Sequence, residues 1–129
     1  MKETVLYYNP ERSPKVAQVK GALVCLGMRI RNITPDQVTQ KVGYLAGLPG
    51  FAETPVEGEL PEIHDEVMVL QGFTDQRLNQ LLYTLKRTEV PRINLKAVVT
   101  EGNSNWTFYE LYEELKMEHE AFEEAKKER

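Results

Sequence analysis

Residues 66–85 read EVMVLQGFTDQRLNQLLYTL, and this stretch predicts a strand followed directly by an amphipathic helix. The apolar run Val67–Leu70 is rich in residues that favour strands, and Gly72 is a typical end signal. Thr74 is the expected N-cap of the helix. Four leucines then recur at positions i, i+3, i+4 and i+7, namely Leu78, Leu81, Leu82 and Leu85. A strand joined to a helix by so few residues favours an α/β fold.

The residues that follow repeat this order. Residues 95–100, LKAVVT, predict a second strand, and Thr107 and Glu110 have the spacing of a capping box that opens a second helix. Trp106 precedes the cap and is placed to pack on Leu111 as a hydrophobic staple. The second half of the chain therefore predicts the order strand, helix, strand, helix.

The first half of the chain shows the same order. Residues 4–8 predict a strand, and the Ser-Pro pair at 13–14 predicts the start of a helix that stops at Gly27. Residues 28–33 alternate in polarity, as a strand with one buried face does. The capping-box segment Thr-Pro-Asp-Gln at 34–37 then predicts a helix whose apolar face is Val38, Val42 and Leu45.

Two such units predict an α/β fold, an internally duplicated β-α-β-α unit with a four-stranded, mainly parallel sheet covered by helices. Equivalent residues keep a nearly constant separation, since Val67 follows Val5 by 62 positions and Thr74 follows Ser13 by 61. A pseudo-twofold would relate the halves, either within one chain or by exchange between chains. A ferredoxin-like sheet is the rival arrangement. It needs a hairpin between its middle strands, and the chain has no Asn-Gly or Asp-Gly turn to supply one.

The length of 129 residues predicts a single domain over 1–129. Its parts are a first half over 1–46, a connector over 47–64, and a second half over 65–129 that ends in an extended helix. Residues 1–46 hold seven Lys and Arg against three Asp and Glu, whereas residues 47–66 hold six acids and no Lys or Arg. Three prolines and three glycines accompany these acids, so we expect an exposed connector without regular structure.

Composition excludes several classes of protein. The chain carries 16 Lys and Arg against 20 Asp and Glu, which is too acidic for a general nucleic-acid binder. It has no run of about 18 apolar residues, so no membrane-spanning segment is expected. The N-terminus lacks the apolar region of a signal peptide, and the single cysteine forms no internal disulfide, so we expect a cytoplasmic protein.

The reactive residues predict no catalytic set, no metal site and no cofactor. Cys25 lies among apolar residues of the first helix and is expected to be buried. The opening LYYNP at 6–10 is superficially like an arsenate-reductase-type thioredoxin fold, but the loop that follows lacks the required thiolate. His64 and His119 have no partner at a metal-ligand spacing.

The two halves differ chiefly at one loop. Six residues over 101–106 separate the last strand from its helix cap, whereas Ile33 leads directly into Thr34. Loops at the carboxyl ends of parallel strands bind ligands in open sheets, so this loop predicts a site for a small polar or anionic ligand, or for a protein partner. The expected contributors are Asn9, Arg12, Gln71, Thr100, Asn103, Asn105 and Trp106. The same composition is also typical of a turn that binds nothing.

Two alternatives to this binding site remain open. A small cofactor-free enzyme would use a polar cluster such as Arg12, Lys96 and Glu101. A purely structural alternative is a homodimer in which the loop only turns the chain. The last helix keeps Phe122 on its apolar side and is charged almost throughout beyond it. Its last turns are therefore expected to protrude or fray, or to dock a partner.

A resemblance to a known family rests on the second half. The strand LKAVVT at 95–100, the Asn-Trp-Thr segment at 105–107 and the run ELYEEL at 110–115 make residues 67–119 similar to a small bacterial domain of unknown function. That domain is found in short proteins of anaerobic Gram-positive bacteria. The family has no established activity, so the resemblance implies no function. It directs attention to the candidate ligand-binding residues Lys96, Thr100, Asn103, Asn105 and Trp106.

Overall fold

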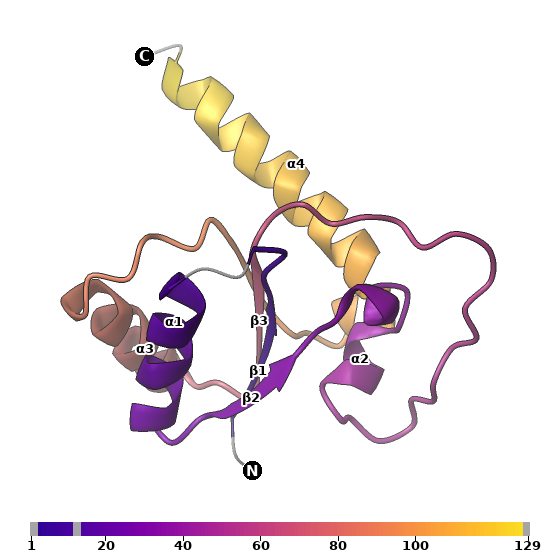
Figure 1. The fold of residues 1–129 in the computed structure, drawn as a ribbon, viewed down its shortest axis with the longest axis horizontal. Coiled ribbons are helices and arrows are strands. Elements are labelled where there is room, and N and C mark those ends of the chain that lie inside the picture. Colours follow the sequence, from indigo (N-terminus) through magenta and orange to yellow (C-terminus); the bar gives the residue numbers. More distant parts are fainter. Residues whose placement is uncertain (1–2, 12–13, 128–129) are drawn as a thin grey trace.

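The computed structural model describes residues 3–11 and 14–127, and these residues form a four-stranded sheet with helices on both faces (Figure 1). The strands are β1 (Thr4–Tyr8), β2 (Arg29–Asn32), β3 (Val67–Gln71) and β4 (Leu95–Val98). Their order in the sheet is β2-β1-β3-β4. β1 is parallel to β2 and β3 is parallel to β4, whereas the central pair, β1 and β3, is antiparallel. The prediction of an α/β fold with a mainly parallel, four-stranded sheet is confirmed.

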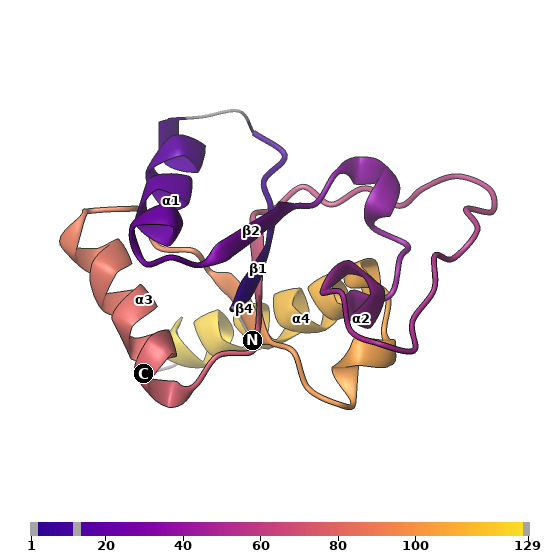
Figure 2. The same cartoon turned by 90° about the horizontal axis from the view of Figure 1, so that it is seen from below.

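Each face of the sheet is covered by one helix from each half of the chain (Figure 2). The helices are α1 (Pro14–Cys25) and α3 (Asp75–Arg87) on one face, and α2 (Val42–Leu45) and α4 (Phe108–Lys127) on the other. Successive strand residues point to opposite faces. Leu6 and Tyr8 of β1 therefore lie in the core under α2 and α4, while Val5 and Tyr7 lie in the core under α1 and α3.

The order strand, helix, strand, 3-10 helix, α-helix occurs twice along the described residues. The 3-10 helices span Pro35–Gln37 and Asn103–Asn105. This repeated order is the one expected from the sequence. An origin of the two halves by internal duplication stays a prediction.

The antiparallel central pair separates strand ends that the sequence pattern places together. Tyr8 at the end of β1 pairs with Val67 at the start of β3, and Thr4 pairs with Gln71. The carboxyl ends of β1 and β2 therefore lie at one end of the sheet, and those of β3 and β4 lie at the other. The expectation that the loops after β1 and β3 come together is wrong, because the direction in which one βαβ unit meets the other is not encoded within either unit.

The helix expected after β2 forms only in part. Its first turn is a 3-10 helix, and α2 begins only at Val42. Between these two pieces the backbone pairs with the start of α4. Tyr109 N–H donates to Val38 C=O and Phe108 N–H donates to Gln40 C=O, both at 2.9 Å. These carbonyls satisfy N–H groups that the first turn of α4 leaves without a partner, and the pairing interrupts the expected helix.

The helix caps expected from the sequence are present where the structure describes them. Thr74 Oγ1 accepts from Arg77 N–H at 3.2 Å. Thr107 N–H donates to Glu110 Oε1 at 2.9 Å, and Glu110 N–H donates to Thr107 Oγ1 at 3.1 Å, which completes the capping box at the start of α4. The expected cap at Ser13 lies outside the described residues.

The connector over 47–64 contains no helix or strand, as expected, and is largely exposed. Hydrogen bonds nevertheless join the connector to the rest of the protein at two places. The buried side chain of Gln40 donates from Nε2 to Thr54 C=O at 2.8 Å and accepts from Thr54 N–H at 2.7 Å. Tyr8 OH donates to Ile63 C=O at 2.9 Å. These contacts hold the acidic connector against the first half and the sheet.

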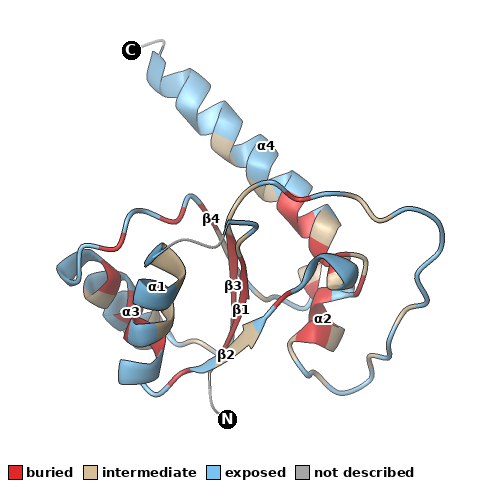
Figure 3. Ribbon diagram, in the orientation of Figure 1, coloured by how far each residue is buried: buried red, intermediate tan, exposed pale blue. Residues whose placement is uncertain are grey.

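One expectation about burial, that of Cys25, is wrong. Cys25 is exposed rather than buried, because it is the last residue of α1 and lies beyond Val19, Ala22 and Leu23, which face the core. Phe122 of α4 is 53% exposed, since α4 leaves the body after its first turns and protrudes (Figure 3). Within the described residues, no helix is both long and apolar enough to cross a membrane.

Candidate functional site

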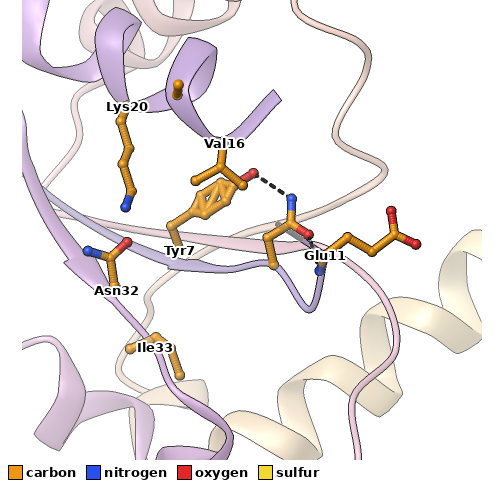
Figure 4. A pocket seen from close by; sticks show the side chains of 8 residues that line it. Tyr7, Glu11, Val16, Lys20, Asn32 and Ile33 are labelled. Atoms are coloured by element: carbon orange, nitrogen blue, oxygen red, sulfur yellow. Dashed lines mark hydrogen bonds between the residues drawn. The ribbon is translucent and has the colours of Figure 1, made fainter. Parts of the chain in front are cut away.

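A cavity of about 670 Å³ opens where β1 and β2 end, against α1 (Figure 4). Because β1 and β2 are parallel, their carboxyl ends lie side by side at this end of the sheet. Open α/β sheets bind ligands at such places. We call this the β1–β2 cavity. Its lining includes Tyr7, Asn9, Glu11, Val16, Lys20 and Asn32.

Strand register and helix spacing build this cavity. Tyr7 of β1 and Asn32 of β2 are register partners, so their side chains point to the same face of the sheet, the face that α1 covers. Val16 and Lys20 are in positions i and i+4 of α1 and therefore share one side of the helix. In Figure 4 the Lys20 side chain extends from α1 toward Asn32, and Val16 lies over the ring of Tyr7.

A network of polar side chains holds Tyr7 and Asn9, two residues of the cavity wall, in place. Tyr7 OH donates to Glu66 Oε2, and Asn9 Nδ2 donates to Tyr7 OH at 3.2 Å. Lys15 forms an ion pair with the other oxygen of Glu66. Burial and the hydrogen bond to Glu66 raise the pKa of Tyr7 well above its ordinary value. Tyr7 therefore keeps its proton at neutral pH and remains a hydrogen-bond donor.

Asn9 shapes the loop after β1. Its Oδ1 accepts from Glu11 N–H at 2.9 Å, the geometry of an Asx turn, and its Nδ2 is engaged with Tyr7. These contacts give the Asn9 side chain a local role in positioning the wall. Arg12, the other residue expected to contribute here, lies outside the described residues.

Lys20 and Asn32 supply polar groups that face the cavity and that no described residue engages. Among the residues that the structure describes, Lys20 forms no ion pair and the Asn32 side chain forms no hydrogen bond. An ammonium group beside a side-chain amide can donate charge-assisted and neutral hydrogen bonds to one ligand. The pair therefore suits an anionic or strongly polar group.

The candidate residues after β4 lie at the opposite end of the sheet and are engaged within their own loop. Asn103 Oδ1 accepts from Thr100 N–H at 2.8 Å, and Asn103 Nδ2 donates to Val98 C=O at 3.0 Å. Thr100 Oγ1 accepts from Asn103 N–H at 3.1 Å. These contacts fit the alternative in which the polar composition of the loop serves a turn.

The other candidate residues at this end of the sheet do not contact one another through side-chain hydrogen bonds among the described residues. Asn105 Nδ2 donates to Glu101 C=O at 3.4 Å. The backbone carbonyl of Trp106 accepts from Val42 N–H at 2.8 Å, while the Trp106 side chain is 39% exposed. Gln71 ends β3 and is partly buried. The antiparallel centre of the sheet keeps all of them apart from the β1–β2 cavity.

Lys96 belongs to neither end loop. It is a register partner of Met68, so its side chain lies on the face covered by α1 and α3, where Nζ donates to Ile93 C=O. Burial, and next the positive charge of Arg92, lower the pKa of Lys96. The structure does not join Lys96 to Glu101, because Lys96 lies at the start of β4 and Glu101 lies beyond its end.

Sequence reasoning missed Lys15, Lys20, Asn32 and Glu66. The sequence does show that Asn32 lies near the end of a predicted strand and that Lys20 follows the apolar Val16 by one helical turn. Both patterns are also typical of a solvated surface, so they do not select these residues. The register of β2 with β1 places Asn32 beside Tyr7, and the packing of α1 on the same face of the sheet brings Lys20 to the same cavity. Within the described residues, no group of three or more His, Cys, Asp and Glu side chains is arranged to hold a metal ion.

No curated protein and no solved structure matches the chain. Residues 66–122 match the model of a family described as Domain of unknown function (DUF3783). This stretch runs from the start of β3 through most of α4. It bears out the expected resemblance to a domain of unknown function, while the bacterial origin stays a prediction. The second half of the chain is therefore similar to that family, and the described lining of the β1–β2 cavity lies outside the matched residues.

Proposed function

We propose that the protein is a binding module for a small polar ligand that carries an anionic group, and that the ligand enters the β1–β2 cavity. The observation that carries the proposal is the meeting of Lys20 and Asn32 in a cavity at the carboxyl ends of two parallel strands. The cation would neutralise the anionic group, and the amide would fix its orientation. The proposal keeps the class of ligand expected from the sequence and moves the site away from the loop over 100–106.

Two further features support binding at this end. α1 begins beside the cavity, and the N–H groups of a first helical turn, with the positive end of the helix dipole, favour a negative charge. The wall residues Tyr7 and Asn9 are held by a hydrogen bond to each other and by that of Tyr7 to Glu66. A wall that is already ordered loses little conformational freedom on binding, so more of the contact energy appears as affinity.

An NMR titration of the full chain with inorganic phosphate, citrate and L-glutamate tests the proposal. We expect saturable shifts at Asn9, Lys20 and Asn32 for at least one of these probes. Lys20→Met keeps the length of the side chain and removes its charge, and we expect it to weaken binding by roughly tenfold. Lys41→Met is the matched control, because Lys41 is another lysine of the first half, is exposed, and does not line the cavity.

Three outcomes of this titration would contradict the proposal. Saturable shifts confined to Asn103–Trp106 would return the site to the loop after β4 and contradict the proposal. The absence of saturable shifts with all three probes would also contradict it. Equal weakening by Lys20→Met and Lys41→Met would show that net charge, rather than the cavity, controls the affinity.

A further inference from the structure

A second cavity, of about 460 Å³, lies between the C-terminal half of α3, the segment that follows it and the start of β4. We call it the α3–β4 cavity. Leu82, Leu85 and Val90 give it apolar walls. Its volume falls within the range of about 300–1,000 Å³ that is usual for small-molecule sites. All of its lining lies within the residues that match the family of unknown function.

Three cations from three different elements line this apolar space. Lys86 is in the last turn of α3, Arg92 lies in the segment after α3, and Lys96 is in β4. None of the lining residues that the structure describes is acidic. The ion pairs found among the described residues do not involve these three side chains. Lys86 also complements the negative end of the α3 dipole, but that role does not account for Arg92 and Lys96.

Lys96 is the most constrained of the three cations. Its side chain lies on the face of the sheet under α1 and α3, is partly buried, and donates to Ile93 C=O. Burial and the charge of Arg92 both lower the pKa of Lys96, and Glu66 opposes them only in part. A partly desolvated cation beside another cation is stabilised when an anion approaches. The apolar walls of the cavity lie next to this charged side chain.

We propose that the α3–β4 cavity binds an amphipathic carboxylate, that is, an acyl or aryl chain bearing one negative charge. The chain lies on Leu82, Leu85 and Val90, and the carboxylate contacts Lys96 and Arg92. The inference is independent of the β1–β2 cavity, because the two cavities share no lining residue. It extends the proposed function by a second site with a different ligand class.

A titration of the full chain with sodium octanoate, followed by methyl and amide NMR spectra, tests this proposal. We expect saturable shifts at Leu82, Leu85, Val90 and Lys96, and none of comparable size at Asn32. Three further probes separate the contributions. Acetate lacks the chain, octan-1-ol lacks the charge and octylammonium reverses it, so each should bind at least roughly tenfold more weakly than octanoate.

Two cavity variants and one control variant keep the test decisive. Lys96→Met removes the cation at nearly constant volume and should weaken octanoate binding by roughly tenfold, whereas Lys127→Met, on the exposed end of α4, should leave it unchanged. Leu82→Glu places a negative charge at the mouth; Leu82 is 39% exposed, so this variant is expected to fold and to lose binding. Equal binding of octanoate and octylammonium, non-saturating shifts, or binding that survives Leu82→Glu would overturn the proposal.

Discussion

Asn103 shows how a single side chain can complete the edge of a sheet. Val99 N–H donates to Leu70 C=O, so the neighbouring Val98 C=O and Thr100 N–H face away from β3. The Asn103 amide accepts from the Thr100 N–H and donates to the Val98 carbonyl. It therefore occupies the place of a further strand at the end of β4, and an edge covered in this way is less open to pairing with another chain.

Replacing Asn103 should destabilise the protein. Asn103→Ala leaves two backbone groups of the β4 edge to solvent, and we expect the free energy of unfolding to fall by about 1–2 kcal/mol. Asn105→Ala is the matched control, since Asn105 makes one longer hydrogen bond of 3.4 Å, and it should change stability by less than about 0.5 kcal/mol. Urea unfolding measures both. Equal losses in the two variants would contradict the role assigned to Asn103.

Glu66 offers a second prediction at the scale of one residue. Its carboxylate accepts from Tyr7 and pairs with Lys15, and its side chain is only 14% exposed. Glu66→Gln removes the charge from a partly buried network, and we expect it to cost about 1–3 kcal/mol in the free energy of unfolding. Glu62→Gln should cost nothing measurable, because the Glu62 side chain is 80% exposed beside His64. Thermal or urea unfolding that ranks the two variants in the opposite order would refute this assignment.

At the scale of elements, the sequence predicts what depends on near neighbours. The caps at Thr74 and Thr107 are correct because each cap and its partner are three residues apart. The helix after β2 is predicted too long because Val38 and Gln40 pair with the start of α4, in the other half of the chain. Cys25 is misjudged because its apolar neighbours in sequence lie on different sides of α1.

The long helix α4 leads to a prediction about stability. Its buried residues, Phe108, Leu111 and Tyr112, all lie in the first turns. Deleting residues 121–129 removes the exposed side chains of residues 121–127, so the free energy of unfolding should change by less than about 0.5 kcal/mol. Leu111→Ala, as the positive control, should cost about 2–5 kcal/mol. A large loss on truncation, seen by urea unfolding, would show that the protruding turns have a contact in solution.

At the scale of the whole molecule, the direction of the central strand pair decides where a site can form. The first βαβ unit has the features of a ligand-binding strand end, and the sequence places Asn9 and Arg12 there. The residues Gln71, Thr100 and Asn103 have similar features but belong to the other end, because β3 runs antiparallel to β1. No local pattern predicts that direction. Lys20 and Asn32 could not be selected from local patterns either, since they reach one cavity only through the pairing of β2 with β1 and the packing of α1 on the sheet.

The three tyrosines with raised pKa values predict a loss of stability in alkali. Burial raises the pKa of Tyr7, Tyr8 and Tyr112, and the carboxylates of Glu66 and Asp65 add to this at Tyr7 and Tyr112. Below about pH 10, tyrosine is protonated in both the folded and the unfolded state. Above that pH the unfolded chain releases protons that the folded protein retains, so the free energy of unfolding falls as the pH rises.

Lys96 acts in the opposite direction. Its lowered pKa means that the buried charge destabilises the folded state only while Lys96 is protonated, so its effect becomes smaller as the pH rises. One lysine opposes three tyrosines, and the net result should be a fall. Urea unfolding between about pH 9 and about pH 11.5 measures the slope. Tyr7→Phe should be less stable than the wild type at neutral pH, because the hydrogen bond to Glu66 is lost, and should lose stability less steeply above pH 10. A wild-type stability that stays level through this range, or an equal slope in Tyr7→Phe, would show that the hydroxyl of Tyr7 is not held in its protonated form by the fold.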